Sequence, residues 1–278
     1  MHKMTTTLPV VLSFGASDSS SATGVIADAM TLVSLGCYPT SVITAVMAAD
    51  TSGSEQLVLI DEDMIEQQAR LILEDMPVAA FNIGLIGSIE NLSRVAEVIA
   101  DYPDMGVVVA LDLTTLSTDE TERDDFFDAY KQMLLTQTSV LVANQYDVMR
   151  LFAQEFEGLP PEDCTALCAQ KIIELGCEYL VLTDSNLGKT QTTLFNPSGE
   201  VRRDTWPRFE GQFRGVNVTL AAALAGMLAS GAAVPEAVRD AQEYTWETLK
   251  NSLRLGMGSL IPDRLFWVRD SDDNEGKV

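Results

Sequence analysis

Short apolar runs alternate with helical patterns along most of the chain. The runs predict strands at residues 10–14, 41–46, 80–83, 107–111, 140–142 and 179–182. Most are nearly continuous in hydrophobic residues, as expected for strands buried on both faces of a sheet. Helical periodicity predicts helices over residues 24–35, 63–75, 89–102, 121–135, 147–156 and 161–175. This repetition predicts right-handed crossovers and a mainly parallel sheet with helices on both faces.

The pattern changes near Thr190. Residues 191–195 and 200–205 are predicted to form a hairpin across Asn196-Pro197-Ser198-Gly199. Two long helices are expected after it, at about residues 216–230 and 235–253. We find no internal repeat and no linker in the sequence. Residues 1–278 are therefore expected to form one domain, with an acidic, flexible tail from about residue 270.

Several element boundaries have a local physical cause. Gly36 and Gly176 each follow a predicted helix, where a C-terminal cap needs a positive φ. Ser88 precedes the helix predicted from residue 89, where its hydroxyl is expected to cap the first turn.

Composition narrows the classes of partner. The chain is 46% hydrophobic, yet no apolar run approaches the length of a membrane span. Its first residues do not form a convincing signal peptide. The net charge of -23, from 41 acidic and 18 basic residues, argues against nucleic acid or anionic membranes as partners. We therefore expect a cytoplasmic protein.

Histidine and cysteine usage excludes other chemistry. The single histidine is His2, which rules out a Ser-His-Asp triad and makes a zinc site improbable. The cysteines are expected to be small buried thiols in a reducing compartment; they are Cys37, Cys164, Cys168 and Cys177.

Carboxylates recur where the predicted strands end, which is the edge at which open parallel sheets bind ligands. They are Asp18, Asp50, Asp112, Asp147 and Asp184. Convergent carboxylates without histidine suggest a divalent cation held through water and phosphate oxygens. The alternative is that Asp caps turns and helices here, which suffices to explain about half of them.

A glycine-containing turn, Gly215-Val216-Asn217-Val218, directly precedes a helix of small residues. The opening amides of a helix lack intrahelical partners and lie at its positive end, so such a turn can hold phosphate. The alternative is an ordinary core helix after a glycine turn.

Four arginines lie close together in this acidic chain, at Arg202, Arg203, Arg208 and Arg214. Such a cluster can bind a phosphate bidentately. Equally, the charges can protect the exposed edge of a hairpin from pairing with another chain.

The order of these motifs resembles that of the hydroxymethylpyrimidine/phosphomethylpyrimidine kinases, a branch of the ribokinase-like superfamily. Residues 15–28 resemble the family's opening motif, and residues 82–86 are similar to its Lys-Ile-Gly-Met-Leu strand end. The other matching segments are residues 35–38, 41–46, 108–112, 144–147 and 215–223. The resemblance covers roughly residues 8–255 and implies a ribokinase-like three-layer α/β/α sandwich with a central, mainly parallel sheet.

The family transfers the γ-phosphoryl group of ATP to a pyrimidine alcohol, and then to its monophosphate, in thiamine biosynthesis. The resemblance implies ATP and Mg²⁺ as cofactors, a small-molecule substrate as partner, and a homodimer. It matches Asp28 to the residue that contacts the pyrimidine amino group, and Asp112 and Asp147 to acidic positions near magnesium. It matches the turn Gly215, Val216, Asn217 and Val218 to the Gly-Thr-Gly-Cys anion hole. Further expected positions are Ala16, Val46 and Ala49 at the substrate, and Asn144, Thr183 and Arg214 at the nucleotide phosphates.

The chain also departs from the family pattern. Val218 occupies the position of the catalytic Cys, and valine cannot accept the proton of a substrate hydroxyl. Thr183-Asp184-Ser185 replaces Lys-Gly-Gly, so a cation next to the phosphates is lost. The other departures are Ala49 for Gln, Asn217 for the second Gly of the anion hole, and Ser21-Ala22 for Gly-Gly.

These observations leave three hypotheses open. The first is an ATP- and magnesium-dependent kinase whose general base is unassigned, with Asp18 and Asp50 nearest by position. The second is a catalytically silent relative that binds a nucleotide or pyrimidine. The third is a related kinase with a changed alcohol, such as a pyridoxal-type vitamer.

Overall fold

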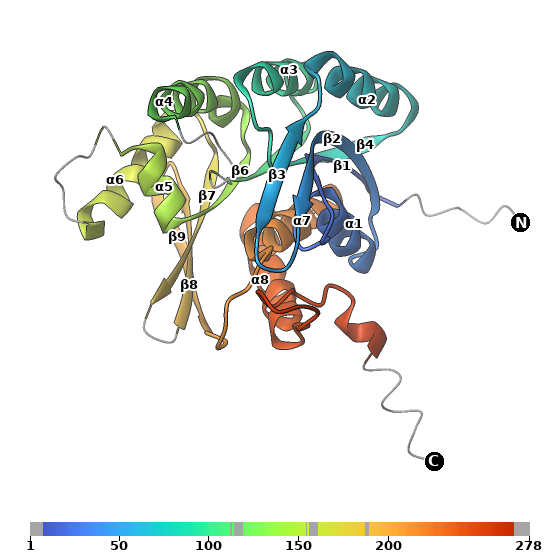
Figure 1. Ribbon diagram of the computed structural model, residues 1–278. Helices are drawn as coiled ribbons and strands as arrows, with labels where there is room; N and C mark the ends of the chain where they lie inside the picture. The colour runs from blue at the N-terminus through green and yellow to red at the C-terminus, as the bar shows by residue number, and fades with distance from the viewer. Residues whose placement is uncertain are drawn as a thin grey trace, which may run out of the picture.

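The computed structural model describes residues 8–111, 113, 119–153, 155, 161–186 and 189–269 (Figure 1). Within these residues, a nine-stranded sheet has the order β3-β2-β1-β4-β5-β6-β7-β8-β9. All neighbours from β2 to β7 pair in parallel, while β3, β8 and β9 are added antiparallel at the two edges. The predicted parallel α/β sandwich is confirmed.

Apart from the differences described below, strands and helices follow one another along the chain in the predicted order. The strands are β1 (Val10–Asp18), β2 (Tyr38–Ala49), β3 (Ser54–Leu59), β4 (Val78–Ile83), β5 (Gly106–Ala110), β6 (Val140–Asn144), β7 (Tyr179–Asn186), β8 (Lys189–Asn196) and β9 (Gly199–Pro207). The helices are α1 (Gly24–Ser34), α2 (Glu62–Asp75), α3 (Ile89–Ala100), α4 (Glu120–Ala129), η1 (Tyr130–Leu134), η2 (Leu135–Gln137), α5 (Gln145–Leu151), α6 (Pro161–Glu174), α7 (Val216–Ala229) and α8 (Val234–Lys250).

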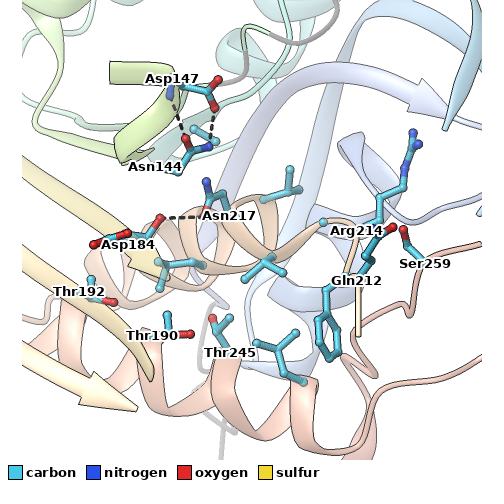
Figure 2. A pocket seen from close by; sticks show the side chains of 18 of the residues that line it. Asn144, Asp147, Asp184, Thr190, Thr192, Gln212, Arg214, Asn217, Thr245 and Ser259 are labelled. Atoms are coloured by element: carbon cyan, nitrogen blue, oxygen red, sulfur yellow. Dashed lines mark hydrogen bonds between the residues drawn. The ribbon is translucent and has the colours of Figure 1, made fainter. Parts of the chain in front are cut away.

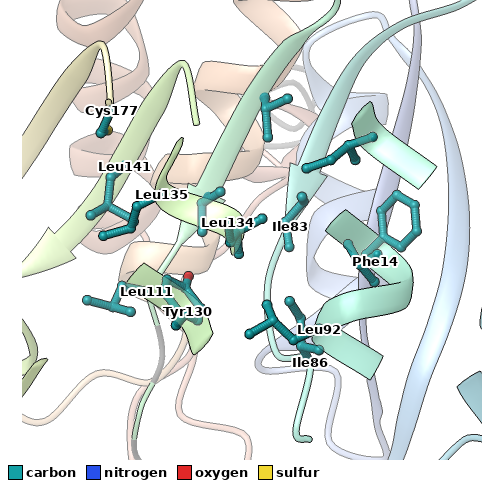
Figure 3. Close-up of a cluster of buried hydrophobic side chains, with 14 of the residues drawn as sticks. Phe14, Ile83, Ile86, Leu92, Leu111, Tyr130, Leu134, Leu135, Leu141 and Cys177 are labelled. Carbon is teal, nitrogen blue, oxygen red and sulfur yellow. The ribbon is translucent and has the colours of Figure 1, made fainter. Parts of the chain in front are cut away.

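Alternate residues of the strands pack against different helices, which produces two hydrophobic layers. On one face, Leu12 and Phe14 of β1 pack in a cluster with residues of α2 to α6 (Figure 3). On the other face, Val11 packs in a cluster with residues of α1, α7 and α8. Because both faces are covered, the central strands are nearly continuous in apolar residues, as the sequence pattern indicated.

The structure differs from the predicted elements in three places. Strand β3 was missed because nearly all of it is exposed at the sheet edge, so its sequence shows no buried face. The helix predicted over residues 121–135 changes to the π-helical turn η1 and the 3-10 turn η2. The helix predicted over residues 147–156 begins at Gln145 and ends at Leu151.

The predicted caps are confirmed. The Ser88 hydroxyl accepts a hydrogen bond from the Asn91 amide, and Gly36 and Gly176 have φ of 77° and 112°. A further glycine, Gly24, opens α1 with φ 68°, and a β-carbon there would lie 2.0 Å from the carbonyl oxygen of Ala16. At Gly24 the β1–α1 loop therefore lies so close to the end of β1 that no residue with a β-carbon fits.

We predict that Gly24→Ala is much more destabilising than Gly36→Ala. Both residues have positive φ, but a β-carbon at Gly36 would meet nothing within 4 Å. Gly36→Ala should therefore lower the free energy of unfolding by about 1–2 kcal/mol, the cost of the backbone conformation. Gly24→Ala should lower it by at least about 2 kcal/mol more, because the backbone must move. Urea unfolding measures both, and equal losses would contradict the close approach.

Candidate functional site

A cavity of about 1060 Å³ lies at the carboxyl ends of the parallel strands. Ala110 and Asn144, the last residues of β5 and β6, line it together with Thr183 of β7, and the first turn of α7 forms part of its wall. Figure 2 shows side chains from the sheet and the helices pointing toward this space. The site thus lies where the topology of an open parallel sheet places a ligand.

The start of α7 faces the cavity and is packed tightly from behind. Its N-cap, Gly215, has φ 87° and supplies no side-chain hydrogen bond to the first turn. A β-carbon at Gly215 would lie 2.0 Å from the carbonyl oxygen of Ala22, so only glycine fits here. Val216, Asn217 and Val218 are already helical, which corrects the expectation of a four-residue turn before the helix.

Behind this turn lies a buried cation, Arg264, which is 2% exposed. Its Nε donates to the Thr219 hydroxyl at 3.0 Å, and its Nη2 donates to the Ala22 carbonyl at 2.7 Å. The guanidinium therefore ties α7 to the β1–α1 loop. Burial lowers the pKa of Arg264 to about 10, which leaves it charged at neutral pH. Sequence reasoning missed this residue, because nothing near it in the chain indicates its partners.

Asn144 and Asp147 form a compact pair at the end of β6. The Asn144 side chain caps α5 by accepting from the Asp147 amide at 2.8 Å, and its Nδ2 donates to Asp147 Oδ2. Thr183 of β7, which pairs with Asn144 in the sheet, donates to Asn217 Oδ1 at 3.4 Å. The structure thus brings Asn144, Asp147, Thr183 and the α7 turn together at one cavity, as the sequence motifs predicted.

Two candidate carboxylates hold loops in place. Asp18 is fully buried and accepts hydrogen bonds from the amides and hydroxyls of Ser20 and Thr23. Burial raises the pKa of Asp18, but these hydrogen bonds outweigh it and lower the pKa below its ordinary value. Asp50 accepts from the amides of Ser52 and Gly53 in the β2–β3 turn. The capping interpretation therefore accounts for both.

The remaining carboxylates fit a metal that arrives with a nucleotide. Asp147 and Asp184 both line the cavity, while the predicted ligand Asp112 lies outside the described residues. The described part of the chain contains no group of three or more His, Cys, Asp or Glu side chains that could hold a metal. Mg²⁺ bound to phosphates needs only one or two protein carboxylates, so the two present fit that mode.

One end of the cavity is aromatic, a feature that sequence reasoning missed. Trp206 and Phe209 lie with their ring centroids 5.9 Å and 5.2 Å from that of Trp246 on α8. The indole nitrogen of Trp206 donates to Gln242 at 3.0 Å, which fixes its ring. These rings come from segments far apart in the chain, so no local motif could have indicated them.

The arginine cluster divides into two groups. Arg202 pairs with Asp204 and Arg203 with Glu200, all on the edge strand β9. These two fit the interpretation of a charged sheet edge. Arg208 and Arg214 instead line the cavity.

The four predicted substrate positions do not line the cavity, and they remain predictions. Ala16 is buried in a small apolar cluster against which Ala49 packs, and Val46 is half exposed. Asp28 is 3% exposed on α1, and its Oδ1 has no hydrogen-bond partner among the described residues. Burial raises the pKa of Asp28 to about 7, although the charge of Arg264 and hydrogen bonds from Asn82 and Ser13 oppose the shift.

The cysteines agree with the sequence interpretation where they are described. Cys37, Cys168 and Cys177 are buried free thiols, and burial raises the pKa of Cys177 to about 12. The side chain of Cys164 lies outside the described part. None of the helices in the described residues is long and apolar enough to cross a membrane.

Comparison with known proteins places this arrangement in a family. The model of the phosphomethylpyrimidine kinase family matches residues 18–263. The chain belongs to that family.

Individual phosphomethylpyrimidine kinase relatives match nearly the whole chain. The hydroxymethylpyrimidine/phosphomethylpyrimidine kinase of Streptomyces coelicolor is 28% identical over 255 residues, covering 91% of this chain and 93% of that protein. That of Rhizobium meliloti is 28% identical over 251 residues, covering 90% and 93%. A solved structure of Staphylococcus aureus pyridoxal kinase with AMP-PCP and pyridoxal is similar with a TM-score of 0.82 at 22% identity, covering 94% of this chain and 95% of that one. The last likeness confirms the fold.

Within this member of the phosphomethylpyrimidine kinase family, the β1–α1 loop has one unusual backbone conformation. Ser21, which the sequence motifs match to the first Gly of the family's Gly-Gly pair, has a positive φ of 57°. Its carbonyl oxygen accepts from Arg264 Nη1 at 3.4 Å. Serine adopts this conformation less readily than glycine does, and the contact with Arg264 holds the loop in it.

We predict that Asp28 makes the protein less stable as pH rises. Because its folded-state pKa of about 7 lies above the ordinary value, the folded state binds the proton more tightly than the unfolded chain between about pH 4 and 7. The free energy of unfolding should fall through this window and level off above it. Relative to Asp28→Asn, the wild type should lose about 2–3 kcal/mol between roughly pH 5 and 8. Urea unfolding at both pH values tests this, and parallel pH dependence in the two proteins would refute it.

Proposed function

We propose that this chain is an ATP-dependent small-molecule kinase that transfers the γ-phosphoryl group to a pyrimidine alcohol or its monophosphate in thiamine biosynthesis. The observation that carries this proposal is the start of α7, whose first turn lines a cavity of about 1060 Å³ with no side-chain cap on its amides. Such amides, at the positive end of a helix, are suited to binding phosphate. The hydroxymethylpyrimidine/phosphomethylpyrimidine kinases among its relatives support the substrate class.

The cavity offers a distinct chemistry to each part of a nucleotide. The aromatic end at Trp206 and Trp246 suits the base, because bases stack on aromatic rings. The first turn of α7, with buried Arg264 behind it, suits the phosphates. Asp147 and Asp184 are then the residues that would hold magnesium, which supplies charge neutralisation of the phosphates when bound.

Phosphoryl transfer depends chiefly on positioning and on charge stabilisation, both of which this chain's own residues supply. The α7 amides fix the phosphates, and the contact of Gly215 with Ala22 fixes the α7 start itself. A general base typically contributes about 10²- to 10⁴-fold to a rate. The absence of a general base at Val218 is therefore compatible with an enzyme that still works, at a reduced rate.

One observation favours a second candidate, a catalytically silent relative that binds a nucleotide or pyrimidine. Val218 and Thr183 line the cavity where the family has Cys and Lys, so both a proton acceptor and a cation are missing. A pyridoxal-type kinase differs from the main proposal only in the acceptor. The main proposal also includes a cytoplasmic location, expected from the composition, and a homodimer, which rests on the family resemblance alone.

We predict that Asp147→Asn reduces turnover by about 10²-fold or more, because a carboxylate near the nucleotide phosphates is lost. The assay incubates the protein with ATP, Mg²⁺ and either hydroxymethylpyrimidine or its monophosphate, and measures product. Asp101→Asn is the matched control, since Asp101 lies on the surface and pairs with Arg70. Thermal unfolding of all three proteins checks the fold.

The two candidates give different results in the same experiment. Product formation by the wild type, lost in Asp147→Asn and kept in Asp101→Asn, supports the kinase. Tight ATP binding without product supports the silent relative. In the kinase, the double change Val218→Cys and Thr183→Lys should raise turnover, since it restores the missing base and cation.

A further inference from the structure

The side-chain amide of Asn217, in the first turn of α7, uses only one of its two ends within the protein. Its Oδ1 accepts from the Thr183 hydroxyl at 3.4 Å. Its Nδ2 makes no hydrogen bond to the residues that the structure describes. Asn217 and Thr183 both line the cavity. A primary amide carries two N–H donors, so both are available to a ligand in that cavity.

The free end of this amide is directed toward the Asn144–Asp147 pair. Figure 2 shows the Asn217 side chain pointing toward these two residues from the start of α7. The amides of the α7 start suit a phosphate, and Asp147 is a residue that would hold magnesium. A phosphate that binds those amides and a magnesium ion at Asp147 together would lie next to the nitrogen of Asn217.

The surroundings favour this orientation of the amide. The Thr183 hydroxyl lies 3.4 Å from Asn217 Oδ1 and 3.3 Å from the carbonyl oxygen of Ala143, so its one proton is shared between two acceptors. Thr183 is itself held in the sheet, where it pairs with Asn144. On the opposite side the carboxylate of Asp147 favours the nitrogen, because an amide N–H carries a positive partial charge.

Asn217 and Thr183 are also two of the positions at which this chain departs from the family pattern. Thr183 stands at the lysine of that pattern, and Asn217 at the second glycine of the anion hole. The structure places the two departures in contact between β7 and α7. A cation is thus missing on the strand, and a neutral hydrogen-bond donor is present on the helix that faces it.

We propose, as an extension that rests on the proposed ATP-dependent function, that the Asn217 side chain donates a hydrogen bond to the terminal phosphate of bound ATP. Thr183 is then a positioning residue, which acts by fixing the amide of Asn217. A hydrogen bond to a charged oxygen is about twice as strong as one between neutral groups, so an uncharged amide supplies a substantial contact.

The terminal phosphate suits Asn217 better than the inner phosphates do. Asn217 directly precedes Val218, which the family pattern matches to the proton acceptor. The phosphoryl group that is transferred has to lie beside that position, where it meets the substrate hydroxyl. The inner phosphates lie farther along the nucleotide, toward the aromatic end of the cavity at Trp206 and Trp246.

The test measures the affinities of the full-length protein for ATP and for ADP, each with Mg²⁺, by isothermal titration calorimetry. ADP lacks the terminal phosphate, so it reports on the rest of the nucleotide site without the proposed contact. Asn217→Ala should weaken ATP binding about 10- to 100-fold, as expected for a hydrogen bond to a charged group, and ADP binding less than about 3-fold. Asn217→Asp should weaken ATP binding at least as much, because it replaces the donor with a negative charge. A carboxylate in the first turn stabilises a helix, so this variant should keep its fold.

Variants of Thr183 test the positioning role. Thr183→Val removes the hydroxyl and should weaken ATP binding about 3- to 10-fold without affecting ADP. Thr183→Ser, which keeps the hydroxyl, should bind ATP as the wild type does. In the Asn217→Ala background, Thr183→Val should cause no further loss, because its effect passes through Asn217.

Asn251→Ala is the matched control. The Asn251 side chain donates to the Glu247 carbonyl at 3.0 Å at the end of α8, and it does not line the cavity. This substitution removes an asparagine amide elsewhere in the protein and should change neither affinity.

Three outcomes overturn the inference while nucleotide binding stands. They are unchanged ATP binding in Asn217→Ala, equal weakening of ATP and ADP, and additive losses in the double variant with Thr183→Val. Binding of neither nucleotide by the wild type overturns the proposed function and the inference with it. An ATP-specific loss in Asn217→Ala, without product from either pyrimidine acceptor in the wild type, supports the role of Asn217 and overturns phosphoryl transfer.

Discussion

The contact between the β1–α1 loop and the first turn of α7 is the constraint on which the site depends. Gly215 brings the helix so close to the Ala22 carbonyl that no β-carbon fits between them. Arg264 bridges the same two segments from behind, and it is buried, so its donors need partners within the protein. Its charge adds to the positive potential of the helix start. Loop, helix and cation therefore form one rigid surface that favours an anion.

This local arrangement matters because the molecule as a whole repels anions. A net charge of -23 disfavours the approach of a polyphosphate at long range. Binding must then come from short-range contacts in a cavity of low dielectric, where amides and guanidinium groups act most strongly. Arg264 supports the helix start from within, and Arg214 lies at the cavity wall beside it. The magnesium of the proposed function would fit beside the carboxylates that line the same space.

Local pattern predicted much of the fold and part of the site. Apolar runs and capping residues predicted the parallel strands and most helices, because a strand buried on both faces is hydrophobic at nearly every position. The family motifs led to Asn144, Asp147, Thr183 and the α7 turn, all of which line the cavity. Strand β3 was missed because an exposed edge strand lacks such a continuous run of hydrophobic residues. Asp18 and Asp50 looked like candidate bases, yet their oxygens are occupied by loop amides and hydroxyls.

Sequence alone was therefore enough for the class of fold, for the edge of the sheet that carries the cavity and for the prediction that Val218 stands at the family's proton acceptor position. The tertiary structure decided which charges act together. Of the neighbouring arginines, Arg203 pairs at the sheet edge and Arg214 lines the cavity. Trp206 meets Trp246, and Arg264 meets Ala22, across long stretches of chain. Periodicity records only whether a residue faces the core, whereas the partner of a charge or ring is set by how distant segments pack.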